Sequence, residues 1–393
     1  MAAPVNSWAG ALKALWSHPA FPMSGTSLGR AVASASELLE RATRQYPKPP
    51  FGLATTQIDG RSVAVREVPL LSTPFCNLLH FERDVPREDP KVLLIAPLSG
   101  HHASLLRDTV ARLLPDHDLY VTDWIDARLI PLSAGRFDLD DYIDLVQRFL
   151  HRIGSEVHVI AVCQPGVPVL AAVSLMAESG DPATPLTMTL MAAPIDTRVK
   201  PTQVDRVATE RPLEWFETAA VHRVPAGEPG FLRKVYPGFL QLTAFVSLDP
   251  GRHAEAHRKL YRDLLAGDEE SADVCRRFYD DYLAVMDVPA EYYLQTIASV
   301  FQKHELARGE MTWRGQRLIR PAAISRTALM TIEGEHDEIT SVGQTSAAHA
   351  LCPAIPAERR RVHIQAGAGH YGVFSGRRWR DEIAPRIAEF IRS

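Results

Sequence analysis

The hydrophobic residues of this chain follow two patterns, which meet near residue 84. Between residues 51 and 83, polar and apolar residues alternate through TTQIDGRSVAVREV and FCNLLHFER, which is typical of antiparallel strands. After residue 90 the apolar residues form short runs instead: KVLLIAPLSG, DLYVTDWID, VHVIAVCQ, TMTLMAAPID, ALMTIEGEHDEIT and RVHIQAGAGH. Helical spacing follows the first two runs, in ASLLRDTVARLL and FDLDDYIDLVQRFLHRI. Strands that alternate with helices predict a mostly parallel, doubly wound sheet.

Two further segments are predicted to be helical. In residues 1–50, SWAGALKALW and SLGRAVASASELLERATRQY have apolar residues at helical spacing before PKPP ends the pattern. Residues 197–321 contain helix-like, aromatic-rich pieces and no comparable strand. An insertion of this length between two strands of one sheet is expected to cover the strand ends as a cap, although a separate domain is an alternative. The predicted organisation is an N-terminal helical segment (1–50), an α/β core (51–196 and 322–393) and a helical cap (197–321).

Composition excludes several classes of protein. The chain has 393 residues, 46% hydrophobic, and a net charge of −4 with scattered Lys and Arg, so binding to nucleic acid is not expected. No apolar run approaches the roughly 20 residues of a membrane span, and the N-terminus lacks the pattern of a secretory signal, so we expect a cytoplasmic protein. The four cysteines are far apart without a C-x-x-C pair, which argues against a zinc site or a disulfide framework.

The sequence VHVIAVCQPGVPVLAAVSLM contains the cysteine with the most informative surroundings. An apolar run ends at Cys163, and after Gln164, Pro165 and Gly166 a second apolar run of helical length begins. This pattern predicts a buried strand, a sharp turn and a helix, with the thiol at the strand end, where α/β proteins bind ligands. We interpret Cys163 as the nucleophile of an α/β-hydrolase elbow, although Ala161 and Pro165 replace the glycines of the G-x-S-x-G motif.

The other members of a catalytic triad follow in the order of the hydrolase fold. Asp337 comes just after the run ALMTIEG, and His370 lies in the glycine-rich stretch GAGHYGVF. A thiol with a pKa near ~8.5 needs an imidazole to take its proton, and the imidazole needs a carboxylate to fix its tautomer. Position in the turn favours Asp337 over three competing carboxylates, Glu333, Glu335 and Glu338.

Acyl transfer also requires donors for the oxyanion. The N–H of Gln164 is the first candidate, and the second is Leu98 or Ser99 in the loop PLSGHH. His101 and His102 in that loop either line the pocket or are ordinary polar residues. A metal site that joins them to the later histidine is not expected, because no carboxylate or cysteine clusters with them, and no cofactor is expected.

Five stretches carry a family resemblance: VIAVCQPGVPVLAAVSLM, VLLIAPLSGHHASLLRDTV, YVTDWIDAR, TIEGEHDEI and GAGHYGVFSGRRW. They resemble the intracellular poly(3-hydroxyalkanoate) depolymerases, specifically the cysteine type that acts on poly(3-hydroxybutyrate) storage granules. The chain is similar, more distantly, to the polyhydroxyalkanoate synthases. The resemblance extends from about Leu53 through the cap and places the family's nucleophile, acid and histidine at Cys163, Asp337 and His370. Residues 1–50 match poorly, so it assigns them no role.

The resemblance implies hydrolysis of an amorphous polyester of 3-hydroxybutyrate through a hydroxyacyl thioester, in the cytoplasm and in association with granules. It also implies an apolar groove formed by cap aromatics, namely Trp215, Phe216, Phe239, Phe245, Tyr292, Tyr293 and Trp313. The alternative for each of them is a place in the hydrophobic core of the cap. The alternatives are a synthase-like acyltransferase and a catalytically silent granule-binding protein. The sequence leaves open the chain-length preference, water or CoA as the acyl acceptor, a homo-oligomeric state and the mode of contact with the granule.

Overall fold

A nine-stranded sheet is the centre of the larger part of the computed structural model, which describes residues 2–44 and 46–393. Its strand order is β1-β2-β3-β5-β4-β6-β7-β13-β14. The strands are β1 (Thr55–Ile58), β2 (Arg61–Ser72), β3 (Cys76–Arg83), β4 (Lys91–Ile95), β5 (Asp118–Trp124), β6 (Val157–Val162), β7 (Thr187–Met191), β13 (Ala328–Gly334) and β14 (Arg360–Gln365). β1, β2 and β3 pair antiparallel, and the strands from β5 to β14 run parallel. The predicted α/β-hydrolase fold is confirmed.

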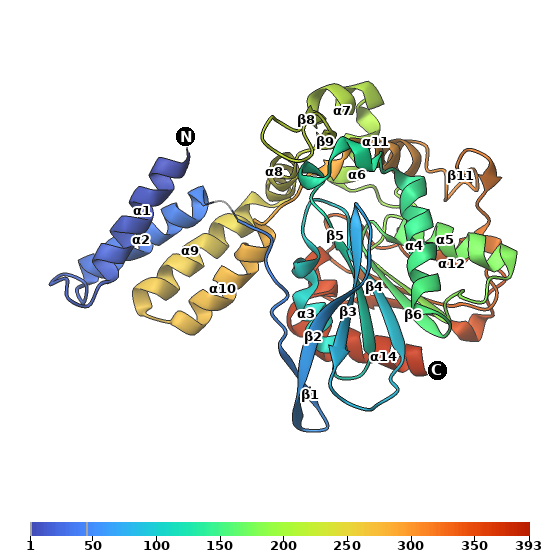
Figure 1. Cartoon of the computed structure of the whole chain (residues 1–393), viewed down its shortest axis with the longest axis horizontal. Coiled ribbons are helices and arrows are strands. Elements are labelled where there is room, and N and C mark those ends of the chain that lie inside the picture. The colour runs from blue at the N-terminus through green and yellow to red at the C-terminus, as the bar shows by residue number, and fades with distance from the viewer. Residues whose placement is uncertain (1, 45) are drawn as a thin grey trace. The chain divides into compact units, whose positions relative to one another are not determined.

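Strand β6 lies in the middle of the parallel part, between β4 and β7 (Figure 1). All six of its residues are buried, which explains why its sequence is an unbroken apolar run apart from one histidine. In register, Ala161 pairs with Ile95 on one side and Val162 pairs with Met191 on the other. The carboxyl ends of the parallel strands therefore meet at one edge of the sheet, where the loops after β4, β6, β13 and β14 can approach one another.

α3, α4, α5 and α14 pack beside the sheet, whereas α6, α7 and α11 lie at the ends of its strands (Figure 1). α4 begins with a capping box, in which Asp138 accepts from the Asp141 N–H (3.0 Å) and Asp141 accepts from the Asp138 N–H (2.9 Å). Trp379 Nε1 donates to the Asp108 carbonyl (3.2 Å) and joins the C-terminal segment to α3. The helices are α3 (Arg107–Leu113), α4 (Leu139–Ile153), α5 (Gly166–Ser179), α6 (Gln203–Glu210), α7 (Leu213–Ala219), α8 (Gly238–Leu248), α11 (Ala290–Thr296), α12 (Ala348–Leu351), α13 (Gly376–Arg378) and α14 (Ala384–Arg392).

The region between β7 and β13 contains short strands besides its helices. β8 (His222–Arg223), β9 (Lys234–Tyr236) and β10 (Val288–Pro289) form a small sheet, and β11 (Thr312–Trp313) pairs with β12 (Arg317–Leu318). Segments of two or three residues are too short to show an alternating pattern, so the sequence predicted only helices here. A π-helix, Ile297–Gln302, continues α11.

A buried arginine attaches this region to the loop after β5. Arg233 donates from Nε to Ile130 O (2.8 Å), from Nη1 to Gly135 O (2.8 Å) and from Nη2 to Pro131 O (2.6 Å). Burial lowers the pKa of this guanidinium, and the three carbonyl oxygens supply acceptors for its donors. The inserted segment around β9 is therefore fixed against the sheet domain by hydrogen bonds, in addition to apolar packing.

The chain divides into two compact units, of which unit 2 contains the sheet (51–241 and 286–393). Unit 1 comprises residues 1–50 and 242–285, whereas the sequence suggested a separate N-terminal segment and a continuous insertion of residues 197–321. Its helices are α1 (Ala2–Ser17), α2 (Ser27–Thr43), α9 (Pro250–Ala266) and α10 (Glu269–Tyr282). None of the helices in the described part of the chain is long and apolar enough to cross a membrane.

Ion pairs hold α2 and α10 together within unit 1. Arg276 donates to both carboxylate oxygens of Glu37 (2.6 and 3.0 Å), and Arg41 pairs with Asp280 (2.8 Å). Burial alone would raise the pKa of Glu37, but its bonds to Arg276 and Lys13 lower it overall. The paired charges lie more than 230 positions apart in the sequence, so no local pattern could predict this contact.

Candidate active site

Cys163 occupies a tight turn between β6 and α5. Its backbone has φ = +68°, a left-handed conformation that is unfavourable for a residue with a Cβ by about 1–2 kcal/mol. Two hydrogen bonds fix the turn: the Cys163 N–H donates to Met191 O (2.7 Å), and the Gly166 N–H donates to Cys163 O (3.1 Å). The structure therefore has the strained strand–turn–helix geometry that the sequence predicted at this cysteine.

The turn forms without the two glycines of the usual motif because other residues leave enough space for the backbone of the turn. A Cβ on Gly166 would lie 2.3 Å from the Ala193 Cβ, so a glycine is required at the start of α5, one position later than in the motif. Pro165 precedes this helix with φ = −56°, where a missing N–H costs nothing. Ala161 is fully buried within β6.

His370 and Asp337 lie side by side at the ends of neighbouring strands. Asp337 follows β13, and His370 follows β14 at the start of a 3₁₀ turn. His370 Nδ1 is 2.8 Å from Asp337 Oδ2 and 3.0 Å from Oδ1, and both residues are buried. The N–H groups of Ile339 (2.9 Å) and Thr340 (2.8 Å) donate to Asp337 Oδ1. The carboxylate is therefore held in one orientation toward the imidazole.

The imidazole of His370 lies close enough to the side chain of Cys163 for the two groups to interact electrostatically. Burial disfavours the charged form of His370, but the charges of Asp337 and Cys163, together with the hydrogen bond to Asp337, outweigh burial. They raise the pKa of His370 well above its usual value. At neutral pH this favours the imidazolium, the form that pairs with a thiolate. The structure thus brings together the three residues that the sequence selected.

Two of the competing carboxylates have other partners. Glu335 Oε2 accepts from the Gly367 N–H (2.7 Å), and its side chain is half exposed. Glu338 Oε2 lies 3.5 Å from the backbone N–H of His370, so it contacts the histidine through the main chain. Asp337 is the carboxylate that contacts the ring nitrogen.

The third competitor, Glu333, has a structural position. It is fully buried in β13, and its Oε1 accepts from three backbone N–H groups at 2.9–3.0 Å, those of Gly343, Thr345 and Ser346. Glu333→Ala is expected to lower the free energy of unfolding by about 3 kcal/mol, because three buried donors lose their acceptor. Urea unfolding measures this difference. Glu335→Ala is the matched control, expected within about 1 kcal/mol of the unmodified protein; equal stability of the two variants would contradict the assignment.

The predicted oxyanion donors lie in two loops at the same edge of the sheet. Leu98 is buried after β4, Ser99 is half-buried, and Gln164 follows Cys163 directly. Within residues 2–44 and 46–393, the N–H groups of these three residues donate to no protein acceptor. The loop after β4 is fixed at Gly100, whose carbonyl accepts from the Met286 N–H (2.7 Å). Next to it, His101 and His102 are buried.

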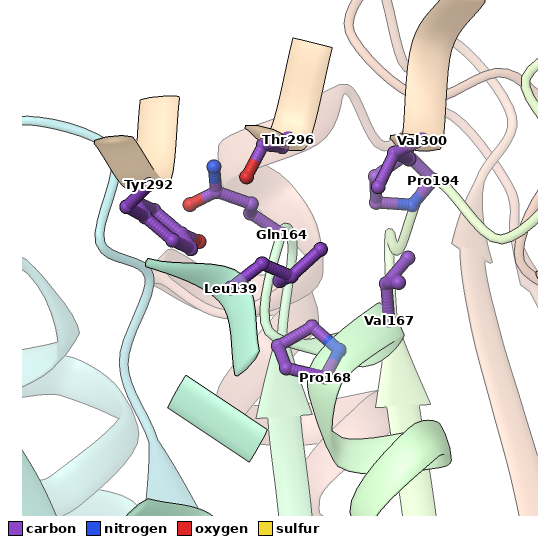
Figure 2. Close-up of a pocket in the computed structure, with 8 residues that line it drawn as sticks. All are labelled: Leu139, Gln164, Val167, Pro168, Pro194, Tyr292, Thr296 and Val300. Atoms are coloured by element: carbon purple, nitrogen blue, oxygen red, sulfur yellow. The ribbon is translucent and has the colours of Figure 1, made fainter. Parts of the chain in front are cut away.

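A small pocket lies beside the turn (Figure 2). Its lining residues are Leu139, Gln164, Val167, Pro168, Pro194, Tyr292, Thr296 and Val300. The side chain of Gln164 extends between Tyr292 and Thr296. Tyr292 was among the aromatics expected to line a groove, whereas another of them, Trp313, donates to Asp144 of α4 (2.7 Å). Thr296 was missed, because a single threonine in a helix carries no sequence signal.

The other cysteines have the surroundings of unreactive thiols. Cys76 and Cys352 are fully buried, and Cys275 is half-buried in α10. Burial raises the pKa of Cys275 and raises that of Cys352 to about 12. In the described residues no group of three or more His, Cys, Asp or Glu side chains is arranged to hold a metal ion.

A comparison with protein families identifies the chain. The model of the family described as PHB de-polymerase C-terminus, where PHB is poly(3-hydroxybutyrate), matches residues 192–393, just over half of the chain. The chain belongs to this family. The match confirms the resemblance seen in the sequence motifs and shows that this PHB depolymerase family member is a hydrolase. The matched region includes Asp337 and His370 and begins after Cys163, so the prediction of Cys163 as nucleophile depends on the geometry of the turn and on the motif around it.

Several solved structures are similar to this PHB depolymerase family member at low sequence identity. A 2-hydroxy-6-oxo-6-phenylhexa-2,4-dienoate hydrolase from Rhodococcus sp. strain RHA1 is 14% identical, with a TM-score of 0.46, covering 84% of this chain and 99% of that one. DcsB in complex with its substrate analogue is 13% identical, with a TM-score of 0.49, covering 84% and 98% of the two chains. No curated protein matches the chain in a sequence search.

Proposed function

We propose that this protein hydrolyses the ester bonds of poly(3-hydroxybutyrate), with Cys163 as nucleophile, His370 as general acid and base, and Asp337 as the residue that orients His370. The observation that carries the proposal is the chain of side-chain contacts from Cys163 to His370 to Asp337 at the strand ends. Membership of the PHB depolymerase family supports the polyester as substrate. Storage granules inside the cell are the form in which this substrate would be met.

In the first half of the reaction, the Cys163 thiolate attacks the ester carbonyl carbon. The carbonyl oxygen takes up the negative charge, and the N–H of Gln164 together with that of Leu98 or Ser99 donates to it. Nδ1 of His370 faces Asp337, which leaves Nε2 to serve the reacting atoms. The imidazolium gives its Nε2 proton to the departing alkoxide as the C–O bond breaks. The products are an alcohol end of the polymer and a hydroxyacyl thioester on Cys163.

In the second half, water attacks the thioester. His370, now neutral, takes a proton from the water as its oxygen bonds to the acyl carbon, and the same donors hold the oxyanion. The C–S bond breaks, the carboxylic acid leaves, and the thiolate–imidazolium pair is restored. The cycle consumes one water for each ester bond. Asp337 stays ionised throughout and fixes the imidazole for both proton transfers.

Two parallel incubations test the proposed function. With amorphous poly(3-hydroxybutyrate) granules, the protein should release soluble 3-hydroxybutyrate acids or short oligomers. With 3-hydroxybutyryl-CoA it should form no polymer, which is the product expected of a synthase-like acyltransferase. Polymer formation, or binding to granules without release of acid, would contradict the proposal; the second result would indicate a granule-binding protein without turnover.

A further inference from the structure

The loop after β4, residues 96–102, is held by a segment that lies far away in the sequence. Gly100 O accepts from the Met286 N–H (2.7 Å). The second oxyanion donor of the proposed reaction, Leu98 or Ser99, lies one or two residues before Gly100. Because peptide units are planar and few dihedrals separate these residues, a shift of the Gly100 carbonyl would move the donor as well.

Gly100 fits closely against a second segment. It is buried and has φ = +93°, a conformation that favours glycine. A Cβ at this position would lie 2.6 Å from Gln241 Oε1, so the side chain of Gln241 packs directly on the Gly100 backbone. Gln241 itself is 9% exposed. The loop after β4 is therefore in contact with α8 as well as with Met286.

Two carboxylates, Asp126 and Asp287, fix the backbone next to Met286. Asp126 Oδ1 accepts from the Asp287 N–H (3.1 Å) and from the Arg128 N–H (2.9 Å). Asp287 Oδ1 accepts from the Gly238 N–H at the start of α8 (3.0 Å). The peptide between Met286 and Asp287 is therefore bonded to the loop after β5, and the Asp287 side chain is bonded to α8.

The start of α8 also packs against the Met286 peptide. A Cβ on Gly238 would lie 2.6 Å from Met286 O and 3.0 Å from Met286 N, so the close approach requires a glycine. Met286 N is the atom whose N–H donates to Gly100 O. The position of this donor therefore depends on the contact that the Asp287 carboxylate makes with Gly238.

Asp287 serves here as a hydrogen-bond acceptor, and its charge is not required. Burial raises the pKa of Asp287, and the charge of Asp126 raises it further. The environment thus disfavours the ionised form, although the Gly238 N–H and the charge of Arg128 partly offset this. An asparagine would keep a side-chain oxygen as acceptor and would remove the charge.

We propose that Asp287 is a positioning residue for ester cleavage. By fixing the Met286 N–H it holds the Gly100 carbonyl, and with it the backbone N–H that faces the oxyanion. This inference rests on the proposed function, because an oxyanion forms only when an acyl group is attacked. Asp287 acts through the backbone of Met286 and Gly100, so its loss should affect the stabilisation of the oxyanion and leave the thiol reactive.

Two reactions of Cys163 test the inference, because only one of them forms an oxyanion. Cleavage of p-nitrophenyl 3-hydroxybutyrate develops negative charge on the carbonyl oxygen, whereas iodoacetamide loses iodide from a saturated carbon. Asp287→Ala should lower kcat/KM for the ester by roughly 10–100-fold, the scale expected when a catalytic group is misplaced. The rate of alkylation at Cys163, followed by peptide mass spectrometry, should stay unchanged.

Two further variants examine the same contact. Gly238→Ala pushes a methyl group against Met286 O without removing a carboxylate, and it should show the same selective loss of ester cleavage. Asp287→Asn retains the acceptor and should restore most of the ester cleavage that Asp287→Ala loses.

Asp181→Ala is the matched control. Asp181 Oδ1 also accepts a backbone N–H, that of Ala183 (2.9 Å). It lies before the amino end of β7, whereas Cys163 follows the carboxyl end of the neighbouring strand β6. Neither ester cleavage nor alkylation should change in this variant.

The outcomes separate this inference from the proposed function. Unchanged ester cleavage in Asp287→Ala and Gly238→Ala, or an equal loss of cleavage and alkylation, would overturn the positioning role and leave the hydrolase in place. Equal losses in Asp287→Asn and Asp287→Ala would also overturn it. If Asp287→Ala does not fold in urea titrations, Gly238→Ala and Asp287→Asn decide by the same criteria. Failure of the unmodified protein to cleave the ester would overturn both the proposed function and the inference.

Discussion

Replacement of Cys163 by alanine is expected to lower kcat for ester cleavage by roughly 10⁴-fold or more, because no other group in the site can form the acyl-enzyme. The contact between Cys163 and His370 places the thiol where the imidazole can hold it as a thiolate, and alanine removes the sulfur while keeping the Cβ. Release of 3-hydroxybutyrate from granules by the two proteins, side by side, measures the effect. Residual turnover above a few per cent of that of the unmodified protein would show that Cys163 is not the nucleophile.

The backbone at this position offers a second measurement on the same residue. Since Cys163 has φ = +68°, Cys163→Gly should relieve strain and raise the free energy of unfolding by about 1 kcal/mol relative to Cys163→Ala. Both variants should be inactive. Cys275→Ala is the matched control, because this half-buried thiol lies in α10 of unit 1 and should be dispensable for turnover. Loss of activity in Cys275→Ala with unchanged stability would contradict the assignment of Cys163 as the nucleophile.

The second large effect is expected for Asp337→Asn, with kcat lower by roughly 10³–10⁴-fold. Asp337 contacts His370 Nδ1 at 2.8 Å and is fixed by the N–H groups of Ile339 and Thr340. An asparagine has nearly the same shape, but it carries no charge to stabilise the imidazolium and can present an N–H that favours the wrong tautomer. Steady-state kinetics on a short 3-hydroxybutyrate ester measures the loss, and Glu338→Gln should retain activity as the neighbouring control.

The raised pKa of His370 predicts how stability changes with pH. A group whose pKa is higher in the folded than in the unfolded protein contributes stability that is complete below its unfolded pKa, near ~6.5 for histidine. This contribution is lost as pH rises through the folded pKa. Urea unfolding of the unmodified protein should therefore show a decline in stability above neutral pH that is smaller in Asp337→Asn, because Asp337 is one of the two charges that raise this pKa. An equal decline in the free energy of unfolding of both proteins would contradict the conclusion that Asp337 raises the pKa of His370.

The elements that hold the site could be predicted from the sequence because their information is local. β6 is an apolar run because it is buried on both sides, and the change at Cys163, Gln164 and Pro165 marks its end. The same reasoning places Asp337 after β13 and His370 after β14. Parallel strands whose ends meet at one edge then bring distant residues into one region. The fold class and the placement of the three predicted site residues at strand ends thus followed from short patterns.

The partners of particular side chains were decided only by the tertiary structure. Four acidic residues lie from position 333 to position 338. Position in the turn favoured Asp337 among them, but nothing in the sequence indicated that Glu333 Oε1 accepts three backbone N–H groups. Likewise, Glu37 and Arg276 meet across 239 positions. Hydrogen bonds act over about 3 Å and depend on direction, so they are set by the assembled fold. Hydrophobic periodicity shows only which face of a helix or strand is buried. The sequence by itself determined those buried faces, because they depend on local residue spacing.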